Sequence, residues 1–259
     1  MWSFLEMRQF GILQLQNATK QTETIDGVEV TKLLIDMPMY WVALSLVVIG
    51  ICAYLLGSLN FAVLISRNRY HDDIRLHGSK NAGTTNMMRT YGSSSAALTF
   101  AGDAAKGLVS CAIGGMLMGQ TGAAVACLFC IIGHVFPCFF GFRGGKGVAV
   151  AAATVLWINP LVFLFVILIF VGVVWWTKYL SLGSIMATAI YPVLLFSFTP
   201  TNYRGIPNVI AVVVAVFIVY LHRANIVRLW NGNENKFKFK KSVKVAPATE
   251  APSDSAEEE

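Results

Sequence analysis

Residues 158–177 read INPLVFLFVILIFVGVVWWT, a stretch without a charged side chain. A helix needs about 20 mostly apolar residues to cross a bilayer, so this stretch predicts a membrane-spanning helix. The whole chain has the same character: of its 259 residues, 56% are hydrophobic and 13% are charged, and the mean hydropathy is +0.61. Soluble domains carry about 25% charged residues, and disordered chains are poor in apolar ones. The composition therefore excludes both classes and predicts an all-α integral membrane protein.

Apolar runs separated by polar breaks predict a bundle of seven transmembrane helices. The predicted spans are 39–65, 95–118, 122–140, 148–158, 161–177, 182–198 and 207–222. The run 148–158 is short for a crossing, so we expect a tilted or half-length helix there. The spans define an N-terminal extension (1–38), a membrane domain (39–229) and a C-terminal tail (230–259). The extension shows no cleavable signal, and two expectations stay open for it: a short amphipathic helix near residues 2–15, or a poorly ordered arm.

Lysine and arginine residues indicate how the spans are oriented. Of the 20 Lys and Arg residues, fifteen lie in segments 66–94, 141–147, 178–181 and 223–259, and four lie in the segments between them, which include the extension. Cytoplasmic segments carry the excess of these residues. The pattern predicts that the N-terminus is outside and the C-terminus is cytoplasmic. The basic and then acidic tail favours contact with anionic lipid over binding of nucleic acid.

Polar residues gather on the predicted cytoplasmic side, first in GSKNAGTTNMMR, residues 78–89. This stretch contains Gly78, Ser79, Asn81, Asn86 and the cation Arg89. Backbone N–H groups of a glycine-rich turn that leads into a helix form an anion site. The stretch therefore predicts an anion-binding loop, with an ordinary polar loop and helix cap as the alternative.

A second glycine-rich stretch, FRGGKG, opens the predicted helix at 148. It contains Gly144, Gly145, Lys146 and Gly147. Such a turn can wrap a phosphate and place an ammonium beside it. The stretch is not a P-loop, because Phe140 stands where the first glycine of that motif belongs. A flexible turn between helices is the alternative.

Other polar residues lie at helix ends or inside spans. Ser184 begins one span, and His222 and Asn225 close the last one; taken singly, each is expected to cap a helix. Asp103 and Lys106 are three residues apart inside a span and therefore share a helix face. We expect them to form an ion pair beside a polar pocket or to contact a ligand.

We expect no metal or cofactor. All five cysteines lie in apolar stretches, including the C-x-x-C pair Cys127 and Cys130, and they are predicted to be buried thiols. The few carboxylates outside the tails are too dispersed in the sequence to predict a Mg²⁺ or Zn²⁺ site.

Taken together, these motifs resemble the bacterial acyl-phosphate:glycerol-3-phosphate acyltransferases of the PlsY type. The matching stretches follow the family's order over residues 45–240: GSLNF (57–61), DIR (73–75), 78–89, GD (102–103), GHVFP (133–137), FRGGKGVA (142–149), SLGSI (181–185) and HRANI (222–226). The sequence departs from the family at Lys80, where a glycine is usual, and at Val150, where a threonine is frequent.

The resemblance implies transfer of a fatty acyl group from acyl phosphate to the 1-hydroxyl of sn-glycerol 3-phosphate, the first step of phospholipid synthesis. The products would be 1-acylglycerol 3-phosphate (lysophosphatidate) and phosphate. It implies an active site on the cytoplasmic side of the bacterial inner membrane that uses no metal, CoA or acyl carrier protein. The alternative function is a membrane transporter of phosphate or organic phosphates.

The resemblance implies functional positions at Ser79, Arg89, Lys146, Ser184, His222 and Asn225, and the two glycine-rich loops add the remaining site residues. We expect Ser79, Lys146, His222 and Asn225 to be catalytic, and Gly78, Asn81, Asn86, Arg89, Gly144, Gly145, Gly147 and Ser184 to bind the substrates.

Overall fold

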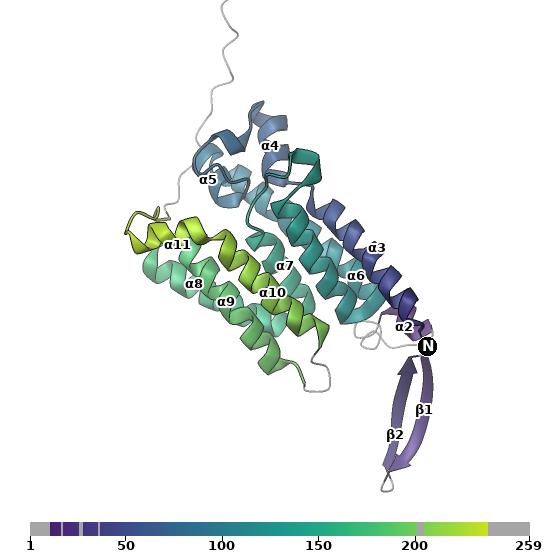
Figure 1. The fold of residues 1–259 in the computed structure, drawn as a ribbon. Coiled ribbons are helices and arrows are strands. Elements are labelled where there is room, and N and C mark those ends of the chain that lie inside the picture. Colours follow the sequence, from purple (N-terminus) through teal and green to yellow (C-terminus); the bar gives the residue numbers. More distant parts are fainter. Residues whose placement is uncertain (1–10, 17, 26–27, 36, 201–204, 238–259) are drawn as a thin grey trace, which may run out of the picture.

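The computed structural model describes residues 11–16, 18–25, 28–35, 37–200 and 205–237. Long helices form the body of the molecule (Figure 1). They are α3 (Met39–Gly57), α4 (Phe61–Tyr70), α5 (Thr84–Tyr91), α6 (Ser93–Val135), α7 (Val148–Ile158), α8 (Pro160–Thr177), α9 (Leu180–Phe198), α10 (Ile206–Leu221) and α11 (Arg223–Trp230). Single 3₁₀ turns, η1 (Ile74–Leu76) and η2 (Cys138–Phe140), join some of them. The chain is thus helical throughout its membrane domain, as predicted.

Within the described residues, four helical stretches are long and apolar enough to cross a membrane. They are Met39–Tyr70, Ser93–Phe140, Pro160–Thr177 and Leu180–Phe198. A fifth is added if α10 and α11, which are bent by 55° at their junction, count as one span. Helix α7 is apolar but shorter. The structure therefore supports a polytopic membrane protein.

Helix α6 folds back on itself. Its backbone leaves the helical region at Met118 and at Gly119, where φ is 58°. Residues on the two sides of this break lie side by side: the Cys111 thiol donates to the carbonyl of Ala123 at 3.4 Å. A straight helix would separate residues 12 positions apart by about 18 Å. Helix α6 is thus a helical hairpin with its turn at the predicted break between two spans.

The helices pack around the α6 hairpin. Helices α3, α7 and α10 lie against α6, and α8 and α9 form a second layer beside α10 (Figure 1). Helix α8 carries apolar side chains around its whole circumference, yet only 6% of its span is buried. Apolar surface of this extent is stable when lipid covers it, so α8 lies at the lipid-facing side of the bundle.

The N-terminal extension is folded in a way that the sequence analysis missed. A short helix, α2 (Ile12–Gln16), precedes the strands β1 (Ala18–Ile25) and β2 (Val28–Ile35), which pair antiparallel from Ala18–Ile35 to Ile25–Val28. The sequence between the strands is Asp-Gly, a dipeptide typical of two-residue hairpin turns. Leu15 is buried where α2 packs on α6. Most of the expected helix at residues 2–15 lies outside the described residues.

The first residues of the predicted C-terminal tail (230–259) pack against the bundle. After α11 the chain turns back, and the N–H of Phe237 donates to the carbonyl of Lys178 at 2.7 Å. Glu234 is buried within this segment. Residues 231–237 of the predicted tail therefore contact the helices, and the rest of the tail lies outside the described residues.

Candidate functional site

Asn86 organises the first glycine-rich loop. This side chain on α5 is buried, and its Nδ2 donates to the carbonyls of Ile74 and His77 at 3.2 and 3.0 Å. Its Oδ1 accepts the N–H of Ser79 at 3.0 Å. Gly78, with φ at 54°, lies so close that a Cβ would collide with this oxygen. Because both amide protons of Asn86 are donated to the protein, this side chain shapes the loop, and its expected substrate contact stays a prediction.

The rest of this loop presents its polar groups outward. Ser79 is exposed and Asn81 is half-buried, and Arg89 lies one turn into α5, whose N-terminus begins after Gly83 without a side-chain cap. The uncapped first turn of α5 leaves N–H groups for an anion. Ser79, Asn81 and Arg89 thus remain as candidate substrate contacts.

The second glycine-rich loop is built for close packing. Gly144 N–H donates to the carbonyl of Val135 at 3.0 Å, and Gly145 N–H donates to that of His134 at 3.2 Å. The carbonyl of Gly144 accepts the N–H of Ala82 at 3.3 Å, which joins the two loops. A Cβ on Gly145 would collide with the His134 ring. These N–H groups are already bonded within the protein, and the glycines permit the close approach of the segments. Substrate binding by Gly144 and Gly145 stays a prediction.

A buried polar network supports this loop from within the membrane domain. The Lys106 ammonium lies 2.9 Å from Asp103 Oδ1 and 3.0 Å from His134 Nδ1. It also donates to the carbonyls of Gly57 and Leu59, at the end of α3, at 2.8 and 2.7 Å. All three charged or polar side chains are buried. The expected Asp103–Lys106 ion pair is confirmed, and it fixes His134, whose carbonyl holds Gly145.

Lys146 extends from the supported loop toward α11. It is half-buried, and its ammonium donates to Asn225 Oδ1. Burial, aided by the neighbouring charges of Arg228 and Arg89 and opposed by that of Glu234, lowers the pKa of Lys146 to about 8. Gly147, with φ at 77°, follows as the uncapped start of α7. Lys146 and the first turn of α7 together offer a cation and helix N–H groups to an anion.

Glu234 is the main group that sequence reasoning missed. Its Oε1 accepts hydrogen bonds from Ser181 Oγ at 3.0 Å and Asn225 Nδ2 at 2.9 Å, and its Oε2 lies 2.7 Å from Arg228 Nε. Burial raises the pKa of this carboxyl, but the hydrogen bonds from Arg228, Asn225 and Ser181 outweigh it and hold the pKa below its ordinary value. Glu234 thus fixes the amide of Asn225, which in turn holds Lys146.

His222 and Ser184 complete the cluster. His222 is buried at the junction of α10 and α11, with Nδ1 lying 2.8 Å from the carbonyl of Ile218. A carbonyl only accepts, so Nδ1 carries the proton and neutral His222 presents Nε2 as an acceptor. Ser184 is also buried, and its hydroxyl donates to the carbonyl of Leu180 at 2.9 Å, which leaves its oxygen lone pairs for a second partner.

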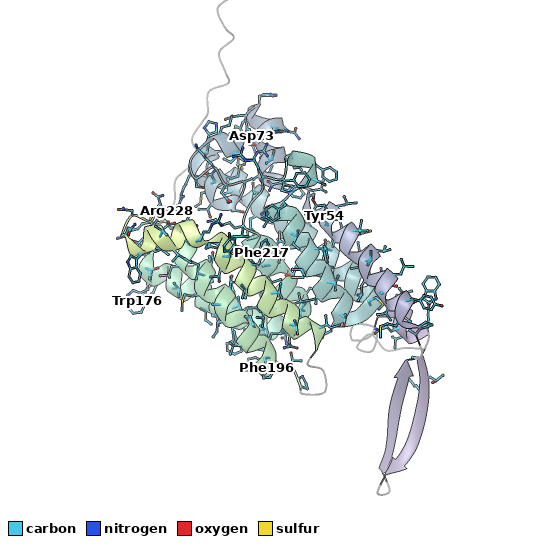
Figure 2. All side chains as sticks on the ribbon, in the orientation of Figure 1. Tyr54, Asp73, Trp176, Phe196, Phe217 and Arg228 are labelled. Carbon is cyan, nitrogen blue, oxygen red and sulfur yellow. The ribbon has the colours of Figure 1, made fainter. Side chains whose placement is uncertain are left out.

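These elements meet at one end of the molecule. Asp73, beside the first loop, and Arg228, on α11, both lie at the end of the bundle away from the hairpin β1–β2 (Figure 2). The arrangement gathers the cations Arg89, Lys146 and Arg228 around the carboxylate of Glu234. It suits anionic, phosphate-bearing ligands. Among the described residues, no group of three or more His, Cys, Asp or Glu side chains could hold a metal ion.

Comparison with known families gives a match over most of the chain. The family model of glycerol-3-phosphate acyltransferase matches residues 47–232. A glycerol-3-phosphate acyltransferase of Syntrophomonas wolfei is 40% identical over 187 residues, which cover 72% of this chain and 94% of the relative. One of Neisseria meningitidis is 40% identical over 189 residues, which cover 71% and 93%.

Solved structures are similar as well. A crystal structure of PlsY (YgiH), an integral membrane glycerol 3-phosphate acyltransferase in its glycerol 3-phosphate form, superposes with a TM-score of 0.70 at 37% identity. The match covers 75% of this chain and 96% of that protein. Its lysophosphatidic acid form gives a TM-score of 0.66 at 36% identity. The extension that carries α2 and the hairpin precedes the family match.

Proposed function

The chain belongs to the glycerol-3-phosphate acyltransferase family, and we propose that it transfers a fatty acyl group from acyl phosphate to the 1-hydroxyl of sn-glycerol 3-phosphate. The products are 1-acylglycerol 3-phosphate and inorganic phosphate. The observation that carries this proposal is the meeting of two loops around Lys146, with Arg89 close enough for its charge to lower the pKa of that lysine. Both substrates carry a phosphate group, and the two cations, Arg89 and Lys146, lie where the two loops meet and can hold both phosphate groups.

The chemistry needs little beyond positioning and charge. Acyl phosphate is a mixed anhydride, so the attacking hydroxyl forms the new ester bond while the acyl–phosphate bond breaks and phosphate leaves. Placing the two reactants together can supply about 7–11 kcal/mol of the barrier, and fixed cations stabilise the developing charge. Lys146 is the group best placed to do this for the leaving phosphate.

The proton of the attacking hydroxyl needs an acceptor. His222 Nε2 is the protein group of the appropriate type, since Nδ1 is bonded to Ile218. The phosphate of glycerol 3-phosphate is an acceptor that the substrate brings itself. We assign Ser79 and Lys146 to acyl phosphate, and Arg89, Ser184, His222 and Asn225 to glycerol 3-phosphate.

For the membrane topology we propose seven spans, with the site on the cytoplasmic side of the bacterial inner membrane. Counting the two arms of α6 separately, and adding α3, α7, α8, α9 and α10, gives seven apolar segments. The basic segments at 66–94 and 223–237 lie near the same end of the bundle, and the hairpin lies at the other (Figure 1). The positive-inside rule then places the site in the cytoplasm and the hairpin outside.

Purified protein in detergent tests the function. We expect formation of 1-acylglycerol 3-phosphate from acyl phosphate and glycerol 3-phosphate, and none from acyl-CoA. Because detergent micelles enclose no compartment, turnover there also excludes the transporter alternative as the sole activity. Acylation with acyl-CoA alone would overturn the donor assignment, and no acylation with either donor would overturn the function.

A further inference from the structure

A basic cavity lies beside the two glycine-rich loops, outside the site described so far. Its volume is about 390 Å³, and it is lined by Asp73, Arg75, Leu76, Lys80, Phe140, Gly141 and Arg143. None of the residues proposed to act on the substrates lines it. Lys80 belongs to the first loop and Arg143 to the second, so the cavity bridges the two segments that build the catalytic site.

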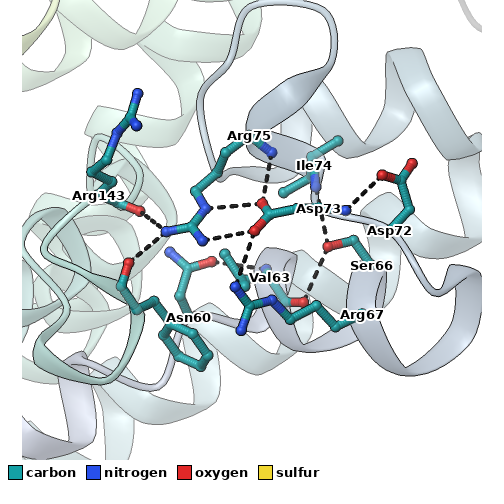
Figure 3. Close-up of polar contacts among 10 residues, drawn as sticks. Asn60, Val63, Ser66, Arg67, Asp72, Asp73, Ile74, Arg75 and Arg143 are labelled. Atoms are coloured by element: carbon teal, nitrogen blue, oxygen red, sulfur yellow. Dashed lines mark hydrogen bonds and ion pairs between the residues drawn. The ribbon is translucent and has the colours of Figure 1, made fainter.

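Arg75 gives the cavity a preformed wall. Its guanidinium contacts both carboxylate oxygens of Asp73, with Nε 2.9 Å from Oδ1 and Nη2 2.7 Å from Oδ2 (Figure 3). Its Nη1 donates to the carbonyls of Phe140 and Arg143 at 2.5 and 3.2 Å. Two hydrogen bonds therefore clamp the segment at Asp73 to the loop at Arg143, and two more hold the guanidinium on Asp73. The cavity beside them does not depend on a ligand for its shape.

The cavity carries excess positive charge. Asp73 is already paired twice, by Arg75 and by Arg67 at 3.1 Å, and the hydrogen bonds from Arg75 hold the pKa of Asp73 well below its usual value. In the part of the chain that the structure describes, no ion pair reaches Lys80 or Arg143. Lys80 and Arg143 both line the cavity and are thus the source of its excess positive charge.

Lys80 holds an unfavourable backbone conformation. Its φ of 57° lies in the left-handed region, which is unfavourable for a residue with a Cβ. A glycine would avoid this cost. Strain that persists at a position where glycine would fit is a reason to look for a role of the side chain, and Lys80 is one of the residues that line the cavity.

We propose that this cavity is a second anion site, which binds the phosphate monoester group of an amphiphile. A phosphate monoester carries a charge of about −1.5 to −2 near neutral pH, which matches Lys80 and Arg143 together. The volume exceeds that of a bare phosphate and leaves room for a glycerol backbone. Phe140 and Leu76, the latter 73% exposed, give the cavity an apolar edge. A bound phosphate joins Lys80 to Arg143 and so ties the two catalytic loops together.

Lipid retention measures this binding without any acyl transfer, so its outcome is independent of the proposed activity. The full-length protein is purified from mixed micelles of phosphatidylcholine with or without phosphatidate, and retained lipid is counted by native mass spectrometry. We expect preferential retention of phosphatidate, and a drop of about fivefold for each of Lys80→Gly and Arg143→Ala, since each removes one cation. Lys80→Gly removes the backbone strain, and Arg143→Ala keeps the carbonyl that Arg75 uses, so both variants should fold.

Two controls make the result specific. Arg69→Ala removes an exposed cation of α4 outside the cavity, and Lys146→Ala removes the cation of the catalytic site; both should retain phosphatidate like the unchanged protein. Equal retention of the two lipids would overturn the proposal, and so would loss of phosphatidate in Lys146→Ala, because the lipid would then lie in the catalytic site. Added inorganic phosphate tests whether the cavity binds the lipid headgroup alone or free phosphate as well. If phosphate displaces the retained phosphatidate, the cavity binds both; if the phosphatidate stays bound, the cavity binds the lipid alone.

Discussion

The pH dependence of acyl transfer should report the charge of Lys146. Burial and the neighbouring Arg228 and Arg89 lower its pKa to about 8, so the ammonium is present below that pH and is lost above it. A group with a pKa of about 8 is roughly nine-tenths charged at pH 7 and one-tenth charged at pH 9. If the charged form is the active one, kcat/KM for acyl phosphate should fall about tenfold over this interval.

Two substitutions isolate this effect. Lys146→Arg keeps the positive charge at every accessible pH, so its kcat/KM should not fall between pH 7 and pH 9. The variant should nevertheless be slower than the unchanged protein, because a planar guanidinium replaces a compact ammonium. In Lys146→Ala, kcat/KM should fall about 100-fold or more, as it does when other groups that stabilise transition-state charge are removed. The assay is the initial rate of phosphate release in detergent at several pH values. A tenfold fall that persists in Lys146→Arg would show that another group titrates, and the role given to Lys146 would be refuted.

Three further predictions follow from the site, the buried network and the topology. Arg89→Ala should raise KM for glycerol 3-phosphate much more than KM for acyl phosphate, because uniform binding of one phosphate is lost; steady-state kinetics with each substrate varied check this, and equal rises would indicate one shared pocket. Lys106→Met should destabilise the protein by about 3–5 kcal/mol, because it leaves Asp103 charged, buried and unpaired. The double variant with Asp103→Leu should recover part of this stability in thermal unfolding; no recovery would show that the unpaired Asp103 charge is not the cause of the loss. Cysteines placed at Lys20 should react with an impermeant reagent from outside intact cells, and cysteines at Lys80 should not; the reverse pattern would overturn the orientation.

Much of the fold could be predicted because apolar length and polar breaks are direct consequences of the bilayer. The break predicted after residue 118 coincides with the non-helical backbone at Met118 and Gly119. The hairpin β1–β2 was missed because its strands lie in a mixed polar segment, where a weak alternating pattern competes with a helical one. The folded segment at 231–237 was missed because its composition is that of a tail.

The site was predictable where the chemistry is carried by unusual residue combinations. Lys146 and Asn225, both singled out by the resemblance, are far apart in the sequence, and the structure brings them into contact. Asn86, Gly144 and Gly145 were singled out as substrate-binding residues, and the structure adds that their hydrogen bonds serve the loops themselves. Glu234 could not be predicted from the sequence, because a lone glutamate after a basic helix is typical of a solvated surface charge. Its contacts with Ser181, Asn225 and Arg228 are set by tertiary packing.

The position of the site follows from the nature of its two proposed substrates. Acyl phosphate is an amphiphile that stays with the bilayer, whereas glycerol 3-phosphate is fully water-soluble, so the reaction needs a place that both can reach. The loops provide it: Ser79 is exposed at the surface, and Lys146 is half-buried above a network anchored by Lys106 inside the membrane domain. Anchoring the loop at His134 fixes the cation in place before either substrate binds, and a preorganised charge costs no reorganisation during the reaction. The buried Asp103–Lys106 ion pair, which is costly to desolvate, therefore serves to hold the loop that carries Lys146 in place.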